Sequence, residues 1–152
     1  MKHIFILVAC MLTLTNCTSS KNSEEITERV SKNMQPLPTI LEVETATRGF
    51  YNQVVIANGV AIVKKTRDGL GVSHKLTPKQ LQELTIAYND FELDKINDYV
   101  SDSNLSSFDA STTTAIKVTN KGDIYISNDF DTVNPPAAFK ALVNCVNQIF
   151  NE

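Results

Sequence analysis

The sequence has little of what marks fibrous or nucleic-acid-binding chains. Its 152 residues include only five Gly and five Pro, which excludes a collagen-like or low-complexity chain. The formal net charge is −3, whereas binding to nucleic acid needs a basic face that replaces counterions. With 42% hydrophobic and 20% charged residues the composition is that of a globular protein, and the length suits one domain.

Residues that carry catalytic or metal chemistry are scarce as well. Beyond the N-terminal segment His74 is the only histidine, and no His or Cys pair has the spacing of metal ligands. Cys145 could pair with His74 as in a thiol hydrolase, but it lies near the C-terminal end of an apolar helical stripe, where the helix dipole disfavours a thiolate. No Gly-x-Ser-x-Gly elbow, phosphate-binding loop or dinucleotide fingerprint occurs. We therefore expect no metal, no cofactor and no enzyme, although the 17 acidic residues leave a catalytic carboxylate pair open.

Long apolar runs are absent except at the N-terminus. Lys2 precedes an apolar stretch, Ile4–Leu14, which has the order of a secretory signal and is too short to span a bilayer. The box "LTNC" that ends at Cys17 resembles the end of a bacterial lipoprotein signal. The rival box Leu7–Cys10 leaves too short an apolar run before its cysteine, and an ordinary signal cleaved nearby stays open as an alternative. We predict that the chain is exported and that Cys17 carries lipid.

The chain then divides into three parts. Residues 1–17 form the predicted lipoprotein signal, 18–37 a polar tether and 38–152 a single domain. The sequence "PLP" at residues 36–38 marks the last boundary, because proline neither continues a helix nor donates to a strand ladder. With Cys17 acylated, Cys145 is left without a disulfide partner in the mature chain, so the core alone must stabilise the domain.

Turn residues predict the strands. Residues 39–49 favour a strand, and two apolar runs then flank Asn58-Gly59, the pair that a type I′ turn requires. This turn places Val55 opposite Ile62, and both faces of the hairpin are apolar near the turn. A second hairpin is predicted over residues 112–130 around "NKGD". Its expected buried face is formed by Ile116, Val118, Ile124 and Ile126.

Capping residues predict two helices. Thr77 begins the first, with Pro78 at the first helical position and Gln80 completing a capping box. The second starts from an Asn134 cap and carries an apolar stripe to Phe150. The order β-β-β-α-β-β-α predicts an α+β domain, in which two helices pack on one face of a largely antiparallel sheet of about five strands.

Charge is distributed unevenly along this domain. Basic residues gather around the end of the first hairpin and the start of the first helix: Lys64, Lys65, Arg67, His74, Lys75 and Lys79. Acidic residues gather after that helix: Asp90, Glu92, Asp94, Asp98, Asp102 and Asp109. Two solvated faces are the simpler interpretation, and a dipolar surface that orients a partner is the alternative.

The order of these features resembles a known family. The strand with "ILE", Gly49, the "NG" turn, "LTPKQLQEL", the strand "TAIKV" and the helix after "NPP" recur in a group of uncharacterised bacterial lipoprotein domains. The pattern is similar to emfourin, a small protein inhibitor of thermolysin-like metalloproteases. It covers residues 39–150 and implies an α+β binding module that acts as a protease inhibitor. Gly49 stands where such domains carry a Gly-rich or Cys-containing turn, whereas this chain has no Cys there.

Four residues form the candidate binding site: Arg48, Gly49, Phe50 and Tyr51. Arg and aromatic side chains supply the anchors of many protein interfaces. The alternative is that Phe50 and Tyr51 are ordinary core residues. We expect a protein partner, either an envelope or a secreted protein, and a lipid anchor that favours the outer membrane. A structural lipoprotein that supports an envelope assembly is the alternative function.

Overall fold

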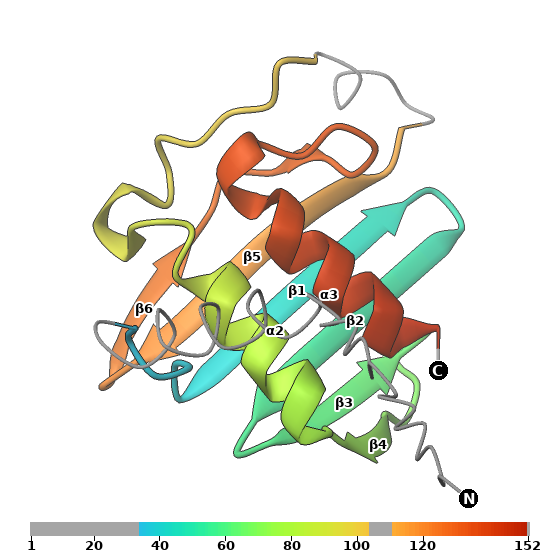
Figure 1. Ribbon diagram of the computed structural model, residues 1–152. Helices are drawn as coiled ribbons and strands as arrows, with labels where there is room; N and C mark the ends of the chain where they lie inside the picture. Colours follow the sequence, from blue (N-terminus) through green and yellow to red (C-terminus); the bar gives the residue numbers. More distant parts are fainter. Residues whose placement is uncertain (1–33, 104–110, 152) are drawn as a thin grey trace, which may run out of the picture. The chain divides into compact units, whose positions relative to one another are not determined.

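The computed structural model describes residues 34–103 and 111–151, which belong to one compact unit (Figure 1). Cys17, the predicted signal and most of the predicted tether lie outside the described residues. Gln35, which falls within the predicted tether, exchanges two hydrogen bonds between its backbone and the side-chain amide of Asn89, at 2.9 and 3.0 Å. Within the described ranges no helix is long and apolar enough to cross a membrane.

The unit is an antiparallel sheet with two helices on one face, as predicted. The strands are β1 (Ile40–Thr47), β2 (Phe50–Ala57), β3 (Val60–Lys64), β4 (Val72–Lys75), β5 (Thr113–Asn120), β6 (Asp123–Ile126) and β7 (Phe130–Asp131). They lie in the order β4-β3-β2-β1-β5-β6, with β7 also paired to β5, and every pairing is antiparallel. Helices α2 (Pro78–Tyr88) and α3 (Lys140–Phe150) cross the same face of the sheet (Figure 1).

Two short strands were not predicted from the sequence. Strand β4 adds an edge beside β3, and three of its four residues are exposed, so it has no buried alternation to signal a strand. Strand β7 has two residues and pairs with Thr113 and Thr114 of β5. Between β6 and β7 the Ser127 hydroxyl accepts a hydrogen bond from the Ile116 backbone N–H, so a side chain bridges the break in the ladder.

The register of the first hairpin is confirmed. Val55 opposes Ile62, and Asn58 and Gly59 have φ values of 51° and 75°, as a type I′ turn requires. Alternate residues of the central strands face the helices and form the sheet half of the core: Leu41, Val43, Val54, Ile56, Ala61, Val63, Ile116 and Val118. On the far face Val55 is half-buried and Ile62 is 38% exposed. The apolar residues on both sides of this hairpin therefore have different surroundings.

In the second hairpin the prediction for β6 is wrong. The two-residue turn Lys121-Gly122 has positive φ at both positions and pairs Val118 with Tyr125. Tyr125 therefore packs against the core, whereas Ile124 and Ile126 are 60% and 51% exposed on the far face. A shift of one residue exchanges the two faces of a strand, and the turn decides the register. The prediction matched apolar residues with one another and ignored the turn.

The beginning of α2 follows the predicted capping box. The Thr77 hydroxyl accepts a hydrogen bond from the Gln80 N–H at 3.3 Å, and the Gln80 side-chain oxygen accepts one from the Thr77 N–H at 2.8 Å. Leu84 and Tyr88 are buried on the face that meets the sheet.

Replacing the cap tests its contribution. We expect Thr77→Ala to lower the free energy of unfolding by about 1 kcal/mol, because N–H groups of the first turn lose their acceptor. Thr85→Ala is a matched control within the same helix, since the Thr85 hydroxyl donates to the Leu81 carbonyl and alanine favours the helix interior. Urea unfolding of both variants measures the difference, and equal losses would contradict a role of the cap.

The start of the last helix differs from the prediction. Asn134 does not cap it: a 3₁₀ turn, η3 (Ala137–Phe139), leads into α3, which begins at Lys140 without a side-chain cap. A residue before proline avoids the α region, so Pro136 keeps Pro135 out of the first helical position that an Asn134 cap would require. The helix therefore cannot begin until the second proline has passed. The apolar stripe is as predicted, and its buried residues are Phe139, Leu142, Val143, Val146 and Ile149.

Candidate functional site

The β1–β2 turn carries the four predicted binding residues. Gly49 has a φ of 86°, and a Cβ added there would meet no other atom, so the turn favours glycine for its backbone conformation and not for lack of space. Phe50 is 45% exposed and Tyr51 is half-buried, and neither belongs to the core. The structure therefore disfavours the alternative in which both rings are core residues.

Phe50 and Tyr51 point to opposite faces of the sheet. Phe50 lies on the same face of β2 as Asn52 and Val54, which face the helices. Tyr51 lies on the opposite, far face together with Gln53. The structure brings the two rings to one tip of the hairpin but not into one flat patch. A partner that contacts both must straddle the turn.

Tyr51 is held in place by two charged side chains. Its hydroxyl donates to the Glu44 carboxylate at 3.2 Å, and the Arg67 guanidinium lies 4.9 Å from the centre of its ring. Arg67 also pairs with Glu44 at 3.6 Å. Burial and the nearby Glu44 raise the pKa of Tyr51, so the hydroxyl stays protonated as a donor. Arg67 thereby ties the loop after β3 to the β1–β2 hairpin.

Sequence reasoning did not assign Arg67 to this site. Its charge was visible within the basic cluster, but nothing in the local sequence indicates that it reaches a tyrosine from another hairpin. An Arg in a loop after a strand would be a weak signal, because most such residues are solvated.

The far face of the sheet is polar at its centre and apolar at its margins. Gln53 donates to Glu42 at 3.0 Å, and Lys117 pairs with the same carboxylate at 3.8 Å. Ile62 lies toward one side of this row, and Ile124 and Ile126 lie at the β6 edge on the other. Neither α2 nor α3 covers this face (Figure 1).

The structure does not assemble the residues considered for catalysis. Cys145 lines the groove between α2 and α3, whereas His74 lines a different pocket beside β4 and the C-terminal end of α3. Burial, and then the carboxylates of Glu83 and Asp90, raise the pKa of the Cys145 thiol, which keeps it protonated. Among residues 34–103 and 111–151, no three His, Cys, Asp or Glu side chains are grouped to hold a metal ion.

Comparison with known proteins adds no relative. No family model matches this chain, and neither the curated proteins nor the solved structures contain a match.

Proposed function

We propose that this protein is a lipid-anchored, protein-binding module of a bacterial cell envelope, and that its β1–β2 turn contacts the partner. The resemblance to emfourin-type inhibitors suggests a protease as that partner. The anchor is Cys17, and the part of the predicted tether that precedes the unit, residues 18–33, sets the reach of the domain from the membrane. The proposed partner is therefore an envelope or secreted protein that comes within this reach.

One observation carries the proposal. The solvent-exposed ring of Phe50 lies at the tip of the β1–β2 hairpin, and side-chain contacts of Tyr51 stabilise the other face of that tip. Phe50 is 45% exposed at the start of β2, where its ring is available to a partner as an interface anchor. On the other face the contacts of Tyr51 with Glu44 and Arg67 restrain the tip. A rigid tip loses little conformational entropy on binding, which favours affinity.

The residues of the tip suggest the chemistry of the partner surface. Phe50 would enter an apolar pocket, and the guanidinium of Arg48 would meet carboxylate or carbonyl oxygens at its rim. A protease cleft offers such a pocket together with polar backbone groups, and a hairpin tip has the shape to enter it.

The test is co-purification from native envelopes with matched variants. Phe50→Ala should weaken the recovered complex at least tenfold, since central aromatic anchors cost about 2 kcal/mol or more when truncated. Ile124→Ala is the control, because it removes an apolar side chain that is even more exposed than Phe50 and lies far from the turn. Both variants should keep the circular dichroism and melting temperature of the wild type. A partner lost with Phe50→Ala and kept with Ile124→Ala supports the proposal, and equal recovery with all three chains contradicts it.

The identity of that partner separates the two binding functions. A stoichiometric protease would indicate an inhibitor, whereas an assembly component would indicate a structural lipoprotein. In the structural role, shortening the tether should impair function, and a pure inhibitor should tolerate it. Mass spectrometry of wild type and Cys17→Ala tests the anchor: an acylated N-terminal Cys17 is expected, and an unmodified N-terminus elsewhere would refute it.

A further inference from the structure

A pocket lies at the end of the sheet opposite to the β1–β2 turn. Its volume is about 710 Å³, within the range of small-molecule sites. Three segments that are far apart in the sequence form it: the start of the unit, the continuous stretch from the end of α2 into η1 (Leu93–Lys95), and the β5–β6 hairpin. The two hydrogen bonds between Asn89 and the Gln35 backbone join the first two segments, so part of the wall is fixed.

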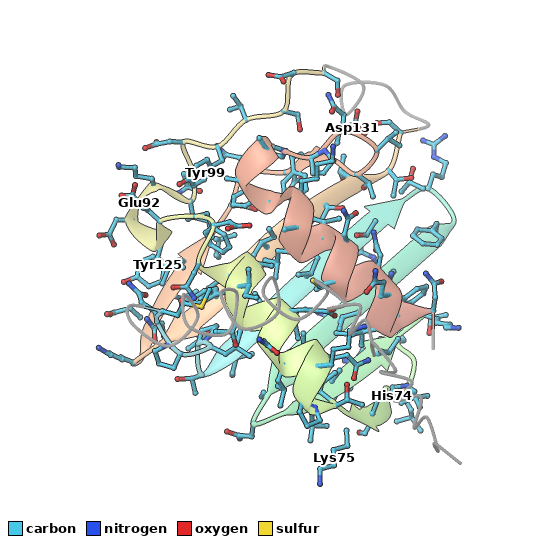
Figure 2. All side chains as sticks on the ribbon, viewed as in Figure 1. His74, Lys75, Glu92, Tyr99, Tyr125 and Asp131 are labelled. Carbon is cyan, nitrogen blue, oxygen red and sulfur yellow. The ribbon has the colours of Figure 1, made fainter. Side chains whose placement is uncertain are left out.

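The charges around this pocket are mostly negative. Its lining contains three carboxylates, from Glu92, Asp94 and Asp123, and one ammonium group, from Lys121. Glu92 is paired with Lys95 at 2.9 Å, but among the described residues Asp94 and Asp123 make no ion pair or side-chain hydrogen bond. The pocket also lies in the acidic half of the domain. Figure 2 shows Glu92 and Tyr125 together on this side, away from His74 and Lys75.

The wall of the pocket contains a buried tyrosine whose hydroxyl lacks a partner. Tyr88 is 3% exposed and lines the pocket, and its hydroxyl makes no hydrogen bond among the described residues. The half-buried Tyr125 stands nearby and lines the same pocket. Burial, and then Tyr125, raise the pKa of Tyr88, so its hydroxyl is neutral and can still accept a hydrogen bond. An unpaired buried hydroxyl is destabilising, and a ligand in the pocket is one partner that could satisfy it.

We infer that this pocket binds a primary ammonium group, of the kind carried by a lysine side chain or a small polyamine. An ammonium group has three N–H donors, and the pocket offers acceptors in the free carboxylates of Asp94 and Asp123 and in the tyrosine hydroxyls. The ring of Tyr125 adds an attractive face for a cation. A neutral sugar could use the hydroxyls but would leave the excess negative charge uncompensated. This site is separate from the turn proposed to bind the protein partner.

The experiment is isothermal titration of the full-length chain, in a neutral detergent, with three probes. Putrescine represents a free polyamine, Nα-acetyl-lysine methylamide represents a lysine of a peptide, and N-acetylglucosamine is the neutral probe. We expect one or both amines to bind and the sugar not to bind. The affinity should fall as salt is raised, because the attraction is between charges near the surface. Tighter binding of the lysine derivative would identify a protein ligand, and tighter binding of putrescine a polyamine.

Two variants test the residues. Asp94→Asn combined with Asp123→Asn should weaken amine binding at least tenfold, whereas Asp129→Asn, an exposed acidic residue outside the pocket lining, should change it less than twofold. Tyr88→Phe removes only the unpaired hydroxyl, so it should weaken binding severalfold and leave the melting temperature of the free protein equal or higher.

Several outcomes would overturn the inference. These are absence of amine binding, binding of the sugar in place of the amines, or equal losses in the pocket variants and Asp129→Asn. A Tyr88→Phe variant with a lower melting temperature and unchanged affinity would mean that a buried water satisfies the hydroxyl, and would remove it from the site.

Discussion

Phe139→Ala is expected to lower the free energy of unfolding by about 3–5 kcal/mol, a large part of the total stability of a small domain. Phe139 is completely buried at the junction of η3 and α3. Three rings surround it, with centroid distances of 5.2 Å to Phe91, 5.1 Å to Tyr99 and 5.3 Å to Phe130. Alanine would leave a cavity among them, because the surrounding rings come from separate segments and can collapse only partly.

Phe150→Ala is the matched control for this prediction. Phe150 lies at the end of α3, is only half-buried, and has the ammonium group of Lys65 5.2 Å from its ring centre. Phe150→Ala should lower the free energy of unfolding by less than half as much as Phe139→Ala, since solvent fills the space that is left. Urea unfolding followed by far-ultraviolet circular dichroism measures both variants. Similar losses for the two phenylalanines would contradict the role of Phe139 as the centre of the aromatic cluster.

Asp131→Ala is expected to lower the free energy of unfolding by about 2–4 kcal/mol. The carboxylate of Asp131 is almost fully buried, accepts a hydrogen bond from the Ser103 hydroxyl at 2.5 Å, and accepts another from the Val133 N–H at 3.1 Å. Each hydrogen bond to a charged group contributes about 1.5–3 kcal/mol, and its loss would leave two donors without an acceptor. Asp131 thus joins the segment before residue 104 to the segment that leads to α3.

Two further variants sharpen this second prediction. Asp131→Asn keeps one acceptor oxygen for the Val133 N–H. It should therefore lower the free energy of unfolding by less than Asp131→Ala does. Asp129→Ala removes an exposed carboxylate two positions earlier, and its effect should stay within about 0.5 kcal/mol. Chemical unfolding provides the comparison. If Asp131→Ala lowers the free energy of unfolding by less than about 1 kcal/mol, the penalty for burying the carboxylate is as large as the stabilisation from its hydrogen bonds.

The features predicted correctly from the sequence depend on residues that are close together in the chain. Asn58-Gly59 determines its own turn and therefore the pairing of β2 with β3. The Thr77 box spans four residues and needs no other part of the molecule to form. The apolar stripe of α3 follows from helical periodicity alone.

The wrong predictions concern the register of β6 and the start of α3, where a rule of local conformation was not applied, and strand β4 was missed because no such rule indicates it. The turn Lys121-Gly122 sets the register of β6, and the prediction gave priority to apolar matching instead. Two consecutive prolines after Asn134 exclude the predicted cap by their own sterics. Strand β4 has no local signal, because among the described residues it pairs with β3 alone and most of its residues are exposed.

The candidate site was predictable in composition but not in geometry. Arg48, Phe50 and Tyr51 stood out as interface-type residues beside Gly49, and the turn does present them at one end of the sheet. The division of the two rings between opposite faces follows from strand alternation. The bracing of Tyr51 by Arg67 does not, because the loop that carries Arg67 is placed by the packing of β3 against β2.

The sequence by itself determined the α+β class, the turn of the first hairpin, the start of α2 and the apolar stripe of α3. Only the tertiary structure decided that β5 lies beside β1, that Asp131 is buried, and that three distant segments form a pocket with Tyr88 in its wall. Turns and caps are governed by dihedral preferences and hydrogen bonds within a few residues. Long-range neighbours are chosen by the free energy of burying apolar surface and pairing backbone groups across the whole chain, which no short stretch of sequence contains.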